Sequence, residues 1–181
     1  MQRELYRCDS FKFSVAFITD SGIEGLLGTL KDLEQKGIKG QILTSDYLCF
    51  TEPKALAKIA QLSNIKLKIY RTQSQGADGF HTKGYIFSDE EVYRIIIGSA
   101  NLTQYALSVN KEWNTKVVTT NQGAYAQTIV GEFEEMWNSP ASQSYDDCIV
   151  EYTQEYEAKK RQLQLQRQQA SIQSTFIIIC T

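Results

Sequence analysis

Histidine is the scarcest reactive side chain in this sequence, because the 181 residues contain a single one, His81. The four cysteines are scattered, and none of them forms a C-x-x-C pair or lies close to the histidine. Zinc sites gather four Cys or His ligands at short spacings, so this pattern disfavours a zinc centre. Buried, structural thiols in a reducing compartment are the better interpretation, which predicts a cytoplasmic protein.

Long apolar runs are also missing. No stretch reaches the roughly 18 apolar residues that a membrane-spanning helix needs, and the first ten residues lack the apolar core of a secretory signal. No membrane partner is therefore expected. The 42% hydrophobic content, with ten Tyr and eight Phe, is instead typical of a globular protein with one sizeable core.

The charge balance excludes a protein that coats nucleic acid indiscriminately, because the formal net charge is −2. Its distribution is uneven. Basic residues outnumber acidic ones from Lys31 to Lys83, and the reverse holds from Gly84 onward. The basic half leads into His81 and would suit contact with phosphates. Ordinary solvated helix faces explain the same charges equally well, so both interpretations stay open.

Apolar segments with a period of two alternate with segments of helical period, which predicts an α/β fold. Strands are expected over 11–19, 39–44, 65–70, 80–87, 92–97 and 112–120. Helices are expected over 22–36 with Ser21 or Asp20 as cap, from Thr51 with Pro53 in the first turn, over 101–107 and over 124–138. On the strand 80–87, alternation would place His81, Lys83 and Tyr85 on one face.

The composition of the sequence changes after residue 138. The string S-P-A-S-Q-S at 139–144 is typical of a linker, 152–169 predicts a solvated Gln-rich helix, and the final F-I-I-I-C-T is strand-like. These features divide the chain into a catalytic domain over 1–140 and a linker with a helical tail over 141–181. The abrupt apolar end predicts a tail that leads into a further domain.

The reactive side chains are concentrated between Phe80 and Asn114. They are His81, Lys83, Ser99, Asn101 and Glu112. An imidazole supplies a nucleophile or proton carrier, ammonium and carboxamide groups stabilise charge on phosphoryl oxygens, and a carboxylate orients the ring. Taken alone, the histidine would be a structural residue and the Ser and Asn would be helix caps. Together, the five side chains indicate chemistry on a phosphodiester.

Several aromatic residues lie close to this segment. Trp113 is expected in the core, which is the commoner place for a tryptophan. Tyr47, Phe50 and Arg71 lie in expected loops near the basic half, where contact with nucleic acid is one interpretation and ordinary surface is the other.

The strings H-T-K at 81–83 and G-S-A-N at 98–101 resemble the signature of the phospholipase D superfamily. The position of Glu112 is similar to that of a glutamate in its single-motif nuclease branch. The fuller pattern, G-S-A-N-L-T followed by N-K-E-W-N, resembles the phospholipase D-like module fused N-terminally to bacterial DEAD/DEAH-type helicases. One departure is clear, because the family's motif aspartate falls on Ser88, with Asp89 one position later.

This resemblance implies a phospholipase D-like α/β sandwich, with a mixed central sheet flanked by helices and an active site at a two-fold dimer interface. Family enzymes use two histidines, and this chain has one, so a homodimer would bring His81 of each subunit together. One His81 would form a phosphohistidine while the other protonates the leaving oxygen. Lys83 and Asn101 would hold the phosphoryl oxygens, Ser99 would bond within the site, and Glu112 would orient the ring. No cofactor or metal is implied.

Three functions are therefore expected, in this order. The first is a metal-independent phosphodiesterase or endonuclease acting on nucleic acid, with DNA favoured, as a module covalently linked to a helicase domain. The second, motivated by Ser88 at the aspartate position, is a DNA- or phosphate-binding module without turnover. The third is a phospholipid phosphodiesterase, which no membrane anchor supports. DNA against RNA, and single against double strand, stay open.

Overall fold

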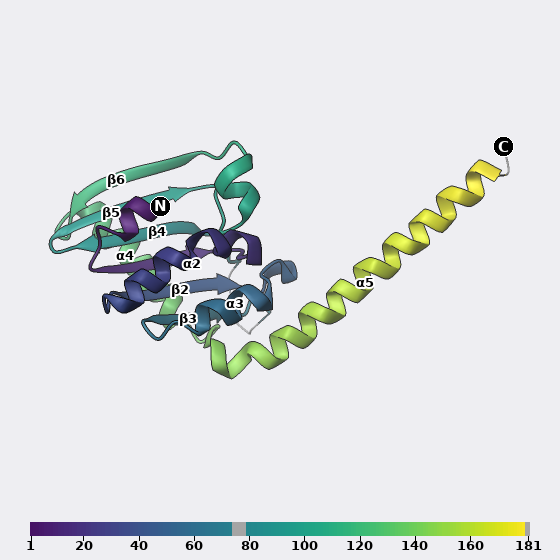
Figure 1. Ribbon diagram of the computed structural model, residues 1–181, viewed down its shortest axis with the longest axis horizontal. Coiled ribbons are helices and arrows are strands. Elements are labelled where there is room, and N and C mark those ends of the chain that lie inside the picture. Colours follow the sequence, from purple (N-terminus) through teal and green to yellow (C-terminus); the bar gives the residue numbers. More distant parts are fainter. Residues whose placement is uncertain (74–78, 180–181) are drawn as a thin grey trace.

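The computed structural model describes residues 1–73 and 79–179, and its body is one sheet between two layers of helices (Figure 1). The sheet has seven strands in the order β6-β5-β4-β1-β2-β3-β7. The strands are β1 Ser10–Val15, β2 Lys39–Ser45, β3 Ile65–Tyr70, β4 Lys83–Asp89, β5 Val92–Gly98, β6 Asn114–Thr120 and β7 Ser142–Ser144. The helices are α1 Gln2–Leu5, α2 Asp20–Gln35, η1 Tyr47–Cys49, α3 Pro53–Ala60, η2 Tyr105–Val109, α4 Ala124–Asn138 and α5 Tyr145–Ile179.

The sheet is mixed. Strands β1, β2 and β3 are parallel and are joined through α2 and α3, as parallel pairing requires a crossover. Strands β4, β5 and β6 form an antiparallel meander next to β1, and β7 pairs antiparallel with β3. The predicted α/β architecture, with a mixed central sheet flanked by helices, is therefore confirmed.

Alternating apolar side chains divide the core between the two faces of the sheet. On one face, Phe11, Phe13 and Val15 of β1 pack with the apolar stripe of α2 and with α3. On the other face, Phe133 and Trp137 of α4 cover a second cluster. The start of α2 differs from the prediction, because its cap is Thr19, whose hydroxyl accepts from the Gly22 amide at 3.2 Å.

One end of each of the seven strands lies at the same edge of the sheet. β1, β2, β3 and β5 end there, and β4, β6 and β7 begin there, as the pairs Val15↔Lys83, Gly98↔Asn114 and Tyr70↔Ser142 show. β4 begins at Lys83 rather than at residue 80. His81 therefore precedes the strand by two residues.

The segment after α4 belongs to the folded body. The predicted linker over 139–144 contains β7, and Cys148 and Tyr152 of α5 lie in the first core cluster. The Tyr152 hydroxyl donates to the Thr51 carbonyl at 2.5 Å. Beyond residue 160 the side chains of α5 are exposed up to residue 170, as expected for the Gln-rich stretch.

Two other predicted segments differ. The strand-like end is helical as far as Ile179, and the last two residues lie outside the described part. The helix expected over 101–107 is a short π-helical turn, η2, four residues later. The expected loop over 71–79 falls largely on residues 74–78, which are also outside the described part. Over the ranges 1–73 and 79–179, no helix combines the length and apolarity needed to cross a membrane.

Replacement of Tyr152 by alanine tests whether α5 is part of the folded body. Tyr152 is fully buried, so we expect the free energy of unfolding, measured by urea denaturation, to fall by about 3 kcal/mol or more. Leu165→Ala is the matched control, because Leu165 lies on the same helix but is 59% exposed, and we expect a change within about 0.5 kcal/mol. Equal effects of the two changes would contradict the packing of α5.

Candidate active site

His81 lies at the edge where the strand ends meet, with its ring beside two aromatic side chains that stack on each other. The imidazole approaches Phe17 and Tyr47 edge to face, with ring centroids 5.8 Å and 6.3 Å away. The following residue, Thr82, is tied to β1 through a 2.9 Å bond from the Ala16 amide to its carbonyl. The exposed imidazole therefore projects from a backbone that is fixed to the sheet.

Lys83 contacts the same imidazole. Its Nζ lies 2.9 Å from Nδ1 of His81 and donates to the His81 carbonyl at 2.8 Å. An ammonium group can only donate, so the Nδ1 atom that faces it presents a lone pair. Partial burial lowers the pKa of Lys83, and the negative charge of nearby Glu112 opposes that shift.

The G-S-A-N segment begins where β5 ends. A Cβ on Gly98 would lie 2.2 Å from the Trp113 carbonyl oxygen, so only glycine fits here. The Ser99 amide donates to that carbonyl at 3.0 Å, and the Trp113 amide donates to Ser99 Oγ at 3.1 Å. The hydroxyl of Ser99 in turn donates to the carboxylate of Glu112.

Glu112 thus has a different partner from the one expected. The sequence predicts a bond from the ring of His81, whereas in the described part of this chain the carboxylate bonds to Ser99 and, at 3.4 Å, to the Asn110 amide. Its charge nevertheless reaches Lys83, so the carboxylate lies within electrostatic range of the motif lysine.

Asn101 completes the group. Its Oδ1 accepts from the Phe17 amide at 3.2 Å, which leaves the amide nitrogen to donate elsewhere. The neighbouring Ala100 carbonyl accepts from the buried Tyr85 hydroxyl at 2.8 Å. Burial, reinforced by the charge of Glu112, raises the pKa of Tyr85, so the hydroxyl stays a donor. The five predicted site residues therefore gather at one edge of the sheet.

The motif aspartate is not replaced by its neighbour. Ser88 and Asp89 lie at the far end of β4 from His81. The hydroxyl of Ser88 bonds to that of Ser10 at 2.6 Å, and Asp89 accepts from Arg94 at 2.8 Å. Both side chains therefore hold strands together at the edge of the sheet opposite the histidine.

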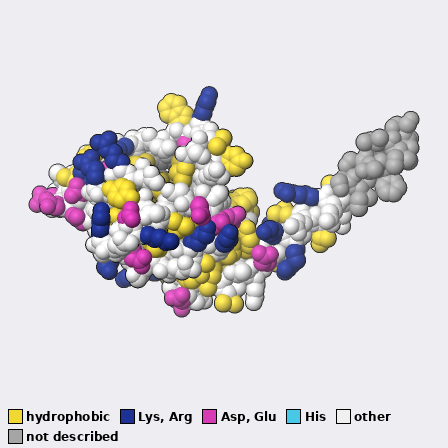
Figure 2. Space-filling view, viewed as in Figure 1, with side chains coloured by type: hydrophobic (Ala, Val, Ile, Leu, Met, Phe, Trp, Pro, Cys, Tyr) yellow, Lys and Arg dark blue, Asp and Glu magenta, His cyan; other side chains and the backbone are white. Residues whose placement is uncertain are grey.

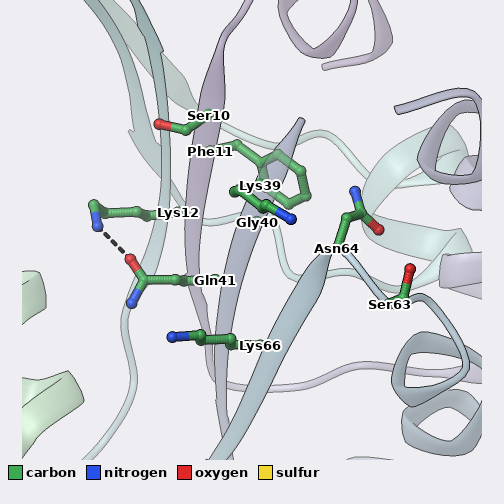
Figure 3. A pocket seen from close by; sticks show the side chains of 9 residues that line it. All are labelled: Ser10, Phe11, Lys12, Lys39, Gly40, Gln41, Ser63, Asn64 and Lys66. Atoms are coloured by element: carbon green, nitrogen blue, oxygen red, sulfur yellow. Dashed lines mark hydrogen bonds between the residues drawn. The ribbon is translucent and has the colours of Figure 1, made fainter. Parts of the chain in front are cut away.

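A separate cavity of about 440 Å³ lies at that opposite edge (Figure 3). Lysines at the starts of three parallel strands line it, and Lys12 donates to Gln41 and, at 2.8 Å, to Glu134. Across the ranges that the structure describes, no three His, Cys, Asp or Glu side chains gather closely enough to hold a metal ion. The cavity lacks the motif residues, so we place the candidate active site at the His81 edge.

Sequence analysis missed two features of this edge. Phe17 lies against His81 at the end of an apolar run that predicts only a buried strand. Trp113 was expected in the core, but 89% of its surface is exposed. The prediction for Trp113 is wrong because this residue directly precedes β6, the outermost strand of the sheet, whose first three residues are exposed. Their positions in the sequence could have indicated a place near the site, because Phe17 and Trp113 lie where strands end or begin.

Comparison with known proteins agrees with this fold. The family model described as cardiolipin synthase, phospholipase D-like domain, matches residues 8–137. None of the curated protein sequences matches the chain. Among solved structures, NucT from Helicobacter pylori is similar with a TM-score of 0.59 at 15% identity, over 79% of this chain and 87% of that one.

Two larger proteins share the fold. Phosphatidylserine synthase from Haemophilus influenzae Rd KW20 has a TM-score of 0.56 at 12% identity, over 79% of this chain and 35% of that one. Polyphosphate kinase from Porphyromonas gingivalis has a TM-score of 0.52 at 13% identity, over 79% of this chain and 21% of that one. The family match covers most of the chain and includes both halves of the motif. The chain therefore belongs to the phospholipase D superfamily.

Proposed function

We propose that this chain is a metal-independent phosphodiesterase that cleaves nucleic acid, with DNA as the favoured substrate. The observation that carries the proposal is the convergence of His81, Lys83 and Asn101 beside Phe17: the imidazole contacts the Phe17 ring, Lys83 contacts the imidazole, and Asn101 accepts from the Phe17 backbone amide. A nucleophile, a cation and an amide donor are the groups that attack on a phosphodiester requires. Membership of a superfamily of phosphodiesterases supports the same chemistry in general terms.

In the proposed first step, a phosphodiester enters the site and its non-bridging oxygens accept from Lys83 and the Asn101 amide. Because Lys83 then donates to the phosphate, the ring of His81 is released for attack. A ring nitrogen forms a bond to phosphorus, and the bond from phosphorus to the leaving oxygen breaks. A second imidazole gives its proton to that oxygen, which leaves as an alcohol.

In the second step, water attacks the phosphohistidine and gives a proton to the second imidazole. The nitrogen–phosphorus bond breaks, and both rings return to their starting states. The hydrogen bond between Ser99 and Glu112 would hold the G-S-A-N segment in place throughout. Loss of that bond would displace Asn101 and weaken the stabilisation of charge on the phosphoryl oxygens.

We propose that the second imidazole comes from a second copy of the chain, since these 181 residues contain a single histidine. A two-fold axis beside the exposed His81 would place the two rings face to face. We therefore propose a homodimer with one composite site. We also propose that α5 connects this catalytic domain to a helicase-type domain in a cytoplasmic protein, a role supported by the exposed side chains of residues 161–170.

Two alternatives have specific support. Position 88 carries no acid, and Asp89 is bound to Arg94, which favours a phosphate-binding module without turnover. The printed names of the family model and of one solved structure refer to cardiolipin synthase and phosphatidylserine synthase, which keeps phospholipid phosphodiester chemistry as a third candidate.

Plasmid cleavage in excess EDTA distinguishes these functions. We expect wild-type protein to nick supercoiled DNA and His81→Ala to fall to background, a loss of at least 1,000-fold if attack by the imidazole is essential, by analogy with the loss of other catalytic nucleophiles (~10³ or more). Tyr125→Ala is the control, because Tyr125 is an exposed aromatic residue on α4. DNA binding without cleavage would favour the binding module, and faster turnover of phosphatidyl vesicles would favour the lipid substrate.

Mixed dimers test the composite site. If each site needs two His81 rings, wild-type chains paired with His81→Ala chains are inactive. When wild-type and His81→Ala chains are unfolded and refolded together, we expect the mixture to be less active than the same amount of wild-type protein refolded alone. Sedimentation should give the mass of two chains. Activity proportional to the wild-type content, with exchange of chains verified, would contradict the shared site.

A further inference from the structure

Three aromatic rings, of Phe17, Tyr47 and Phe50, form a continuous group beside His81, which we call the aromatic shelf. Phe17 stacks on Tyr47 with centroids 6.2 Å apart and planes 21° from parallel, and it meets Phe50 edge to face at 5.1 Å. Tyr47 is 40% and Phe50 51% exposed. In Figure 2, hydrophobic side chains are exposed at the end of the body nearest to α5. The shelf therefore offers ring surface to a ligand at the catalytic edge.

The backbone that carries the shelf is held in an unfavourable conformation. Within η1, Leu48 and Cys49 have φ values of 52° and 56°, in the left-handed region that side chains with a Cβ seldom occupy. Such strain persists where neighbouring contacts enforce it, and it is common in ligand-binding segments. Here it turns Tyr47 and Phe50 outward to the same side of the loop, against Phe17.

An ion-pair network centred on the buried side chains of Asp46 and Arg71 supports this conformation. Asp46, directly before η1, accepts from Arg71 Nε at 3.0 Å and from the Thr72 amide at 2.8 Å. Arg71 also contacts two acidic residues of α5, Glu151 at 3.4 Å and Glu155 at 2.7 Å. The loop is thus anchored to β3 and to α5, so the shelf is ordered before any ligand binds and the entropic cost of binding is low.

We propose that the aromatic shelf stacks on the base of an unpaired nucleotide next to the phosphate at His81, which makes single-stranded nucleic acid the substrate; this rests on the proposed function. The rings lie within contact distance of the imidazole, and a nucleotide places its base one sugar away from its phosphate. In a duplex, the faces of the bases are covered by their stacked neighbours. An unpaired base exposes a face that an open aromatic surface can bind.

The shape of the shelf favours a base over an acyl chain. It consists of flat rings, two of them nearly parallel, whereas an aliphatic chain is best enclosed by a groove of aliphatic side chains. Tyr47 also keeps a polar hydroxyl, which suits a heteroaromatic ring with polar edges. Stacking on bases tolerates sequence differences, so little sequence preference is expected.

Binding to inactive protein tests the shelf independently of cleavage. The full chain with His81→Ala is titrated against three fluorescent 12-nucleotide probes: oligothymidylate, an abasic strand with the same phosphates, and a blunt duplex. We expect oligothymidylate to bind about tenfold more tightly than the abasic strand, as stacking by one base allows. With Tyr47→Ala and Phe50→Ala added, that ratio should fall to about one. Adding Tyr47→Phe and Phe50→Tyr instead should preserve it.

Tyr125→Ala is the matched control, because Tyr125 is 41% exposed but follows the far end of β6 from the site. It should leave the ratio unchanged. Equal affinity for the abasic strand, or tighter binding to the duplex, would overturn the proposal. Two further outcomes would also overturn it. In both, replacing Tyr47 and Phe50 by alanine leaves the ratio of affinities for oligothymidylate and the abasic strand unchanged, but abolishes either the dimer or the binding to anionic phospholipid vesicles. If wild-type protein fails to cleave but the ratio holds, the failure concerns the proposed function and not the shelf.

Discussion

The hydrogen bond from Tyr85 to the Ala100 carbonyl joins the two halves of the motif. It links β4, which begins at Lys83 just after His81, to the segment that carries Ser99 and Asn101. The hydroxyl is fully buried, so its loss would leave a carbonyl without a partner in the core. The ladder between β4 and β5, which pairs Gly84 with Ile97, also joins these segments, and the Tyr85 bond fixes the backbone of Ala100 just beyond the end of that ladder.

Much of the fold follows from the sequence. Period-two and helical patterns predict β3 and α4 with their observed bounds, because both elements bury one clear apolar face. The motif strings predict the superfamily and the five residues of the candidate site. They succeed because a glycine with no space for a Cβ and polar residues at strand ends are local features that a sequence displays directly.

The rest depends on tertiary contacts that no local pattern encodes. His81 lies outside β4 because β1 ends beside it, and Trp113 is exposed because β6 lies at the edge of the sheet. The aromatic shelf combines residues from three separate positions in the chain with an anchor from α5. The role of Arg71 was open in the sequence and became clear only when Asp46 and Glu155 were seen around it.

Helix α5 extends away from the folded body, and its first turns contact the loop beside His81 through Arg71. At a rise of roughly 1.5 Å per residue, its 35 residues extend about 50 Å, and only the first turns contact the body (Figure 1). A load applied to the outer half acts through a long lever arm on the Arg71 ion pairs. Such a load would therefore disturb first the strained loop beside His81, which these ion pairs hold.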